Sequence, residues 1–291
     1  MGLRLKFNLV LILVFAIGFA AAGFVSYELL QRNAKKEVLR DARLMMESAL
    51  AVRKYTVDQV QPELLKVMND TFFPQTVPAF AATETLNTLR KNYPDYSYKE
   101  ATLNPTNPRD RATDWEADIV NRFRQDNDVK EVVAERDTPT GRQLYIARPI
   151  QITNDACLQC HTTAEMAPPS MIKMYGPANG FGWKHNEIIG AQVVTVPMDL
   201  PIRTAQHAFI AFMSSLAVVF VLVFVALNLM LSYMIIAPIR RISSAADDIS
   251  NGDFEQPEFN ESGKDEIATL SRSFNRMRRS LEKAMQMIED N

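Results

Sequence analysis

Residues 143–152 read QLYIARPIQI and residues 188–196 read IIGAQVVTV, and these two stretches decide the fold class of the chain. Both are rich in Ile, Val and other residues that favour β-strands. A further strand is expected over residues 129–135, and the TPTG sequence at residues 138–141 is typical of a hairpin turn. Because helical patterns flank these strands, we predict an α+β fold with an antiparallel sheet and long flanking helices.

The segment on the N-terminal side of the strands has the pattern of a long helix. Residues 28–68 contain no glycine and no proline before Pro62, and apolar residues recur every three or four positions. Arg53 falls on the apolar face, where it either extends past apolar neighbours to solvent or faces a buried anion. Shorter elements follow: a helix over residues 83–92 capped by Thr83, a loop over residues 93–111, and an amphipathic helix over residues 115–126.

The five residues CLQCH, at positions 157–161, lie between two of the predicted strands. Cys-x-x-Cys-His is the attachment signature of c-type haem. Cys157 and Cys160, the only cysteines in the chain, would form thioethers with the vinyl groups, and His161 would ligate the iron. Two alternatives use the same residues: a zinc site with His185 as the fourth ligand, and a disulfide or redox-active cysteine pair. We favour one covalent haem c per chain.

Two uncharged stretches are long enough to span a bilayer as helices: residues 9–27, LVLILVFAIGFAAAGFVSY, and residues 208–236. Basic residues lie at one end of each run: Arg4, Lys6, Arg240 and Arg241. By the positive-inside rule both termini are cytoplasmic, and the segment between the runs lies outside the bacterial inner membrane, where c-type haem is attached. A signal peptide cleaved at residues 20–22 is the alternative, but the first run exceeds a typical signal core.

The segment after the second span predicts two helices that need a partner helix. Its first helix carries a heptad pattern at Ile239, Ile242, Ala246 and Ile249. Its second helix carries one at Ile267, Leu270, Phe274, Met277, Leu281, Ala284 and Ile288. Between them, residues 251–254 (NGDF) read as a helix stop and residues 265–267 (DEI) as a helix start. Such seams bury their apolar residues against a second helix, so we expect a homodimer.

Two family resemblances rest on quoted residues. Residues 238–242 (PIRRI), the NGDF and DEI segments, and residues 274–277 (FNRM) resemble the HAMP linker of bacterial transmembrane receptors. Residues 45–56 (MMESALAVRKYT), 104–108 (NPTNP), the CLQCH motif and residues 179–183 (NGFGW) resemble c-type haem sensor domains with a PAS-like core. The HAMP resemblance implies a parallel dimer. Together with the apolar runs and the positive-inside rule, the resemblances divide the chain into these segments: a cytoplasmic N-terminus over residues 1–6, spans over 7–30 and 207–236, a periplasmic haem domain over 31–206, and a HAMP domain over 237–291.

The second axial ligand of the iron stays open between several residues. In some relatives a cysteine supplies it, but this chain has no third cysteine. Met46, on the apolar face of the long helix, is a soft donor and our first choice, although methionine is most often a core residue. His185 lies among polar neighbours typical of an exposed turn, and His207 lies at the membrane boundary. Another methionine or an open site completes the alternatives. Arg53 is the candidate partner of a haem propionate.

The sequence predicts a non-enzymatic transmembrane sensor that relays a redox or gas signal to the cytoplasm. The net charge of −2 gives no indication of nucleic-acid binding, and the apolar runs indicate contact with membrane lipid. We find no phosphate-binding loop or nucleophile motif, so output is expected through a kinase or other effector acting in trans. The alternatives are a membrane-anchored c-type cytochrome that carries electrons, and an accessory subunit of a membrane complex.

Overall fold

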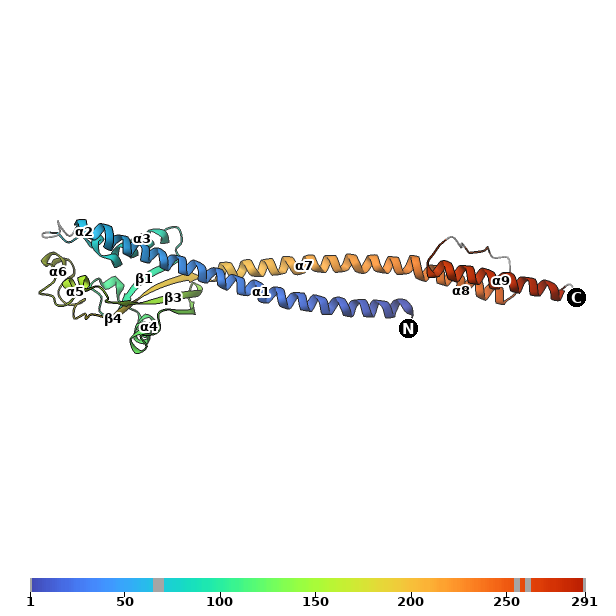
Figure 1. The fold of residues 1–291 in the computed structure, drawn as a ribbon, viewed down its shortest axis with the longest axis horizontal. Coiled ribbons are helices and arrows are strands. Elements are labelled where there is room, and N and C mark those ends of the chain that lie inside the picture. Colours follow the sequence, from blue (N-terminus) through green and yellow to red (C-terminus); the bar gives the residue numbers. More distant parts are fainter. Residues whose placement is uncertain (1, 65–70, 254–256, 260–262, 290–291) are drawn as a thin grey trace. The chain divides into compact units, whose positions relative to one another are not determined.

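The structure is a computed structural model that describes residues 2–64, 71–253, 257–259 and 263–289 (Figure 1). The chain divides into two compact units. One contains residues 27–209, and the other contains residues 1–26 together with residues 210–291. Each unit is described by itself below.

In the unit of residues 27–209, the helix α1 (Leu3–Tyr55) supplies the apolar stripe that the sequence predicts. It buries Ala34, Val38, Ala42, Met45, Met46 and Ala49. The π-helical turn η1 (Thr56–Val60) and α2 (Gln61–Leu64) continue it. The helix predicted over residues 28–68 is therefore confirmed as far as residue 64, and the last part of that prediction, including Met68, lies outside the described residues.

Four antiparallel strands form the sheet, in the order β1-β4-β3-β2. They are β1 (Ser97–Thr102), β2 (Val132–Thr138), β3 (Gly141–Gln151) and β4 (Ile188–Pro197). The α+β prediction is confirmed. The loop predicted over residues 93–111 is wrong in part, because β1 lies within it and pairs with β4 along its whole length. The prolines around β1 indicated a loop, whereas its backbone hydrogen bonds with β4 stabilise a strand.

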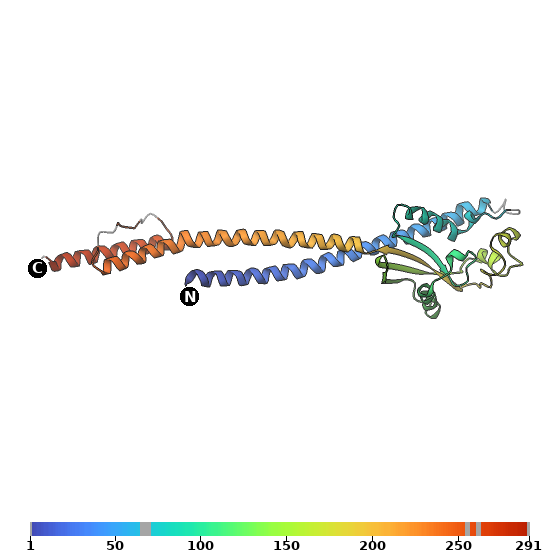
Figure 2. The same cartoon turned by 180° about the vertical axis from the view of Figure 1, so that it is seen from behind.

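Helices cover both faces of the sheet, as Figures 1 and 2 show. Val194 and Val196 pack with α1 and α3 (Pro78–Arg90) on one face, and Ala191 and Val193 pack with α4 (Asp114–Gln125) on the other. This alternation follows from the two-residue period of a strand. Thr83 does not cap a helix as predicted: α3 begins five residues earlier, at Pro78, and Thr83 is buried inside it. Proline at the first helical position has the φ angle that a helix requires.

The shorter elements gather around the CLQCH motif. They are η3 (Pro74–Thr76), η4 (Pro108–Asp110), η5 (Asp155–Cys157), α5 (Leu158–His161) and α6 (Pro169–Tyr175). Figure 1 shows α2, α5 and α6 at the same end of the sheet.

The second unit contains the N-terminal part of α1 and most of α7 (Asp199–Met230), then the π-helical segment η6 (Leu231–Ile236). Two continuous helical stretches, Leu3–Leu64 and Asp199–Ser250, are long and apolar enough to cross a membrane. Within this unit the rings of Phe15 and Phe220 stack with centroids 4.8 Å apart, so the two apolar helices lie side by side.

The helices α8 (Ala237–Ser250) and α9 (Glu266–Glu289) end this unit. The predicted stop after residue 250 and start near residue 265 are confirmed, while Phe254 of the stop lies outside the described residues. Ile242, Ala245 and Ile249 of α8 are buried against Phe274 of α9. Asn275 exchanges two hydrogen bonds with the backbone of Phe259, which fixes part of the connector on α9.

Candidate functional site

A cavity of about 240 Å³ lies in the unit of residues 27–209, and all three residues that carry chemistry in the CLQCH motif line it. Its wall combines α1 and η1, the start of α3, strand β1, the loop after β1, and α5 and α6. Residues from these elements include Arg53, Val57, Phe80, Glu100, Thr106, Asp110, Cys157, Cys160, His161, Met171, Tyr175 and Trp183. Segments far apart in the sequence therefore converge on one hollow.

Contacts of its ring and of its backbone hold His161 in place. Its Nδ1 lies 2.7 Å from the carbonyl oxygen of Gly180, and its ring stacks on Trp183 with centroids 3.9 Å apart. Trp183 also donates its backbone N–H to the carbonyl of His161. Because a carbonyl only accepts hydrogen bonds, Nδ1 carries the proton and Nε2 keeps a lone pair. Burial lowers the pKa of His161, although the Gly180 carbonyl opposes this shift, and a neutral imidazole is the form that binds a metal.

Cys157 is exposed and Cys160 is half-buried, and both are free thiols. Partial desolvation by the surrounding cavity wall raises the pKa of both, with the nearby Arg53 charge opposing the rise at Cys157. A redox-active cysteine pair shows the opposite behaviour, because its nucleophilic thiol has a lowered pKa. The environment of these thiols therefore gives no support to a thioredoxin-like role.

The zinc alternative also finds no support in the geometry. His185 does not line the cavity, and its Nδ1 lies 2.7 Å from the carboxylate of Asp155. Within the described ranges, no group of three or more His, Cys, Asp and Glu side chains is placed to hold a metal ion.

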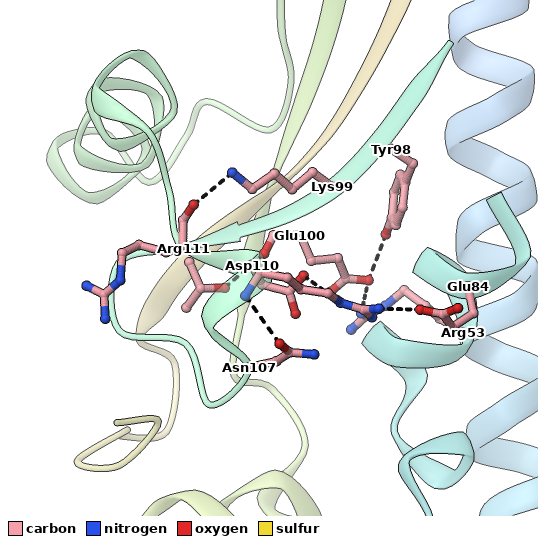
Figure 3. A network of polar contacts seen from close by, with 10 residues as sticks. Arg53, Glu84, Tyr98, Lys99, Glu100, Asn107, Asp110 and Arg111 are labelled. Carbon is pink, nitrogen blue, oxygen red and sulfur yellow. Dashed lines mark hydrogen bonds and ion pairs between the residues drawn. The ribbon is translucent and has the colours of Figure 1, made fainter. Parts of the chain in front are cut away.

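Arg53 lines the cavity and forms an ion pair with Glu100 of β1 (Figure 3). Glu100 also accepts a hydrogen bond of 2.7 Å from the hydroxyl of Tyr98. The side chain of Glu100 is only 4% exposed, and that of Arg53 is 25% exposed. Burial acts to lower the pKa of Arg53, but attraction to Glu100, Tyr98 and Cys157 and the hydrogen bond to Glu100 together outweigh it, and the pKa is raised. The anion that faces Arg53 in this structure is therefore a carboxylate of the chain itself.

Asp110 is a second carboxylate in the cavity wall. It follows β1 in the short helix η4, where the Asn107 side chain accepts a hydrogen bond from the backbone of Arg109 (Figure 3). Burial raises the pKa of Asp110 to about 6, the Arg109 charge lowers it, and the Glu100 charge raises it. Arg109 also pairs with Glu84 of α3, so its charge is shared between two carboxylates.

The structure does not bring Met46 to the cavity. Met46 is fully buried between α1 and the sheet, among Ala42, Ile146 and Val194. It precedes Arg53 by seven residues, which is about 10 Å along a helix. The apolar stripe of α1 therefore packs in the hydrophobic core around Met46. The helix lines the cavity only further along, near Arg53 and Val57. Met171 of α6, which is 2% exposed, does line the cavity.

The sequence alone indicates no role for Trp183, Gly180, Glu100 or Asp110. The two glycines of the NGFGW segment predict a turn, but they do not indicate that this turn contacts His161. Gly180 and Gly182 have φ angles of +86° and +83°, values that favour glycine. The carboxylates of Glu100 and Asp110 gave no signal, because both residues lie in a stretch that resembles a loop.

A sheet flanked by helices, a Cys-x-x-Cys-His cavity and two long apolar helices are features of the membrane-bound haem sensor class. The family model Tll0287-like matches residues 31–197, and the chain belongs to this family. The HAMP domain model matches residues 230–283. Both family resemblances are thus confirmed.

Individual relatives match smaller parts of the chain. The heme sensor protein HssS of Staphylococcus aureus, strains JH9 and Newman, is 39% identical over 84 residues, 28% of this chain and 18% of the relative. The chain thus matches less than a fifth of the length of these relatives. The crystal structure of the cyanobacterial heme-protein Tll0287 aligns with a TM-score of 0.44 and 15% identity, covering 55% of this chain and 95% of that one.

Proposed function

We propose that the chain is a membrane-anchored sensor that holds one covalent haem c in the cavity of residues 27–209. The observation that carries the proposal is the arrangement around His161: a half-buried, neutral imidazole whose Nδ1 proton points to the Gly180 carbonyl and whose Nε2 keeps its lone pair. Metal-ligating histidines commonly donate their other ring N–H to a carbonyl in this way. Two free thiols line the same cavity. The residues present therefore fit the group that the family membership implies.

Each residue has a distinct part in this proposal. Cys157 and Cys160 would hold the haem as thioethers, and His161 would be its axial ligand. Trp183, stacked on His161, keeps the imidazole plane fixed and excludes water from one of its faces. Arg53 contributes positive charge at the cavity wall while it remains bound to Glu100. When bound, the haem supplies one-electron redox chemistry and an iron that can bind small ligands.

The proposed signal path uses helices that join the two units. The helix α1 carries Arg53 in the cavity wall and extends back to Leu3 without a break in its secondary structure. We propose that this helix crosses the inner membrane, that both termini are cytoplasmic and that the haem unit is periplasmic. A change at the haem would alter α1 and, through the HAMP domain, the contact with a kinase or other effector in trans. A HAMP dimer with two packings would be the two-state element.

Covalent attachment is tested by a pyridine haemochrome spectrum of the purified full-length protein, made with a c-type haem maturation system. We expect one haem per chain that resists acid–acetone extraction. In the Cys157→Ala/Cys160→Ala variant we expect covalent haem to be lost altogether, because no thioether can form. A Met166→Ala variant, which alters an exposed methionine, is the control and should keep its haem. Wild-type protein without covalent haem would overturn the proposal.

The same preparations identify the ligand opposite His161. If a Met171→Ala variant converts a six-coordinate spectrum into a five-coordinate one, Met171 is that ligand. If the wild type and Met171→Ala both give five-coordinate spectra, the site opposite His161 is open. A Met46→Ala variant should leave the spectrum unchanged, because Met46 lies in the core.

The homodimer is proposed because α9 presents an apolar stripe that its own unit does not cover. Leu270, Met277 and Leu281 are 44%, 48% and 44% exposed. A Leu281→Lys variant should weaken dimerisation by roughly 10- to 100-fold, since burying one leucine contributes about 1.5–3 kcal/mol. Sedimentation in detergent measures the change, and Gln286→Lys, also on α9, is the control. A wild-type monomer with a redox-active haem would favour the electron-carrier alternative.

A further inference from the structure

The wall of the haem cavity contains a carboxylate, Asp110, to which the proposed function assigns no role. Its side chain is 16% exposed, and its near partner is Arg109, with Nε 3.3 Å from the carboxylate. It lines the same cavity as His161 and the two cysteines, but it comes from η4, the short helix after β1. Asp110 therefore lines the space in which the charge of a bound haem would change.

The charges that face Asp110 come from several elements. Arg109 beside it, Lys99 and Glu100 of β1, and Tyr175 of α6 interact with it directly. Arg53 of α1 and Glu84 of α3 are the ion-pair partners of Glu100 and Arg109. Most of the cations among them are already engaged with other carboxylates. Arg53 binds Glu100, Lys99 lies 2.7 Å from Glu116, and Arg109 divides its charge between Glu84 and Asp110. The neighbouring cations therefore compensate the negative charge of Asp110 only in part.

Incomplete compensation and burial explain why the pKa of Asp110 rises to about 6. A carboxylate in this condition changes its protonation when a nearby charge changes by one unit. A further negative charge in the cavity disfavours the ionised form and promotes protonation. A further positive charge has the opposite effect.

We propose that Asp110 is a proton acceptor coupled to the haem: when one electron arrives, the Asp110 carboxylate takes one proton from solvent. The inference rests on the proposed function, which supplies the haem. The electron comes from an external one-electron donor, such as a reduced quinone or another cytochrome. Asp110 changes from carboxylate to neutral carboxylic acid, and this proton would offset the one negative charge that the electron adds to a bound haem. The sensor would therefore respond to redox state and pH together.

The sign of the coupling follows from linkage between the two events. Because the reduced state binds the proton more tightly, a lower pH favours reduction. The midpoint potential should fall as the pH rises through the range in which Asp110 is protonated only in the reduced state. Below this range both states are protonated, above it neither is, and the potential should be independent of Asp110.

The test is a redox titration of the full-length haem protein in detergent, from about pH 5 to about pH 8, around the pKa near 6. Wild type should show a potential that falls with pH. Asp110→Asn, which is neutral and has nearly the same shape, should lose this dependence and keep a potential near the low-pH value of wild type. Asp118→Asn, which removes an exposed carboxylate of α4 outside the cavity, should behave as wild type.

An infrared difference spectrum of reduced minus oxidised wild-type protein gives a second readout that needs no variant. A band of a protonated carboxyl group should appear on reduction and should be absent in Asp110→Asn. Equal pH dependence in wild type and Asp110→Asn, or no carboxyl band in wild type at any pH, overturns the inference and leaves the haem proposal intact. Wild-type protein without covalent haem overturns the proposed function, and this inference falls with it.

Discussion

An Arg53→Met variant is expected to lose about 3–5 kcal/mol of unfolding free energy, because Glu100 would remain buried without its counter-ion. The side chain of Glu100 is 4% exposed, so solvent cannot replace the lost charge. The remaining partner, the Tyr98 hydroxyl, donates one hydrogen bond but carries no positive charge. Arg53 itself is 25% exposed, which places the expected loss near the lower end of that range. Urea unfolding followed by fluorescence of Trp115 and Trp183 measures it.

The double variant Arg53→Met/Glu100→Gln separates two effects on stability: the loss of the ion pair, and the cost of leaving the Glu100 carboxylate buried without a counter-ion. Because both charges are removed together, we expect it to recover much of the stability that Arg53→Met loses. Arg40→Met, on the exposed face of α1, is the matched control. Arg40 is 67% exposed and its ion pairs with Glu37 and Asp41 lie in solvent, so its loss should cost less than about 1 kcal/mol. If the Arg53→Met variant has the same unfolding free energy as the Arg40→Met variant, the prediction is wrong.

This ion pair also shows why part of the site could not be predicted from the sequence. The helical pattern places Arg53 on the apolar face of a helix, and the structure confirms that placement. Its partner Glu100 was not found, since the strand β1 that contains it resembles a loop between prolines. Hydrogen bonds to a distant strand, β4, make residues 97–102 a strand, and no local pattern contains that information.

The prediction that Met46 ligates the iron shows what helical periodicity cannot indicate. The pattern on α1 correctly identified Met46 as facing inward, but a helix face continues past the point where the core ends and the cavity begins. Met46 packs against Val194 and Ile146 on the sheet, whereas Arg53, two turns later, reaches the cavity. Which turn of a helix meets a cavity depends on the length of the strands it covers. The CLQCH motif needed no such information, because its chemistry depends on five consecutive residues.

Two independent constraints favour glycine at position 180. Its φ angle is +86°, and a Cβ atom at this position would lie 2.0 Å from Oγ1 of Thr106 and 2.9 Å from the Thr106 Cα. The second contact is with backbone, so a change of the Thr106 rotamer cannot relieve it. The carbonyl of Gly180 is also the acceptor for Nδ1 of His161. Any side chain at residue 180 therefore moves the group that orients the proposed axial ligand.

A Gly180→Ala variant is consequently expected to weaken the bond between His161 and the haem iron. Loss of a partner that orients a ligating histidine typically costs 10- to 100-fold in affinity. Free imidazole should then displace His161 at roughly 10- to 100-fold lower concentration than in wild type, as followed by the absorption spectrum of the haem. Gly182→Ala is the control, because Gly182 has a similar φ of +83° but no atom within 4 Å of the added Cβ. The control carries the backbone strain without the steric clash, so the difference between the two variants measures the clash alone. Identical imidazole titrations of the two would show that the Gly180 carbonyl does not hold His161 in place.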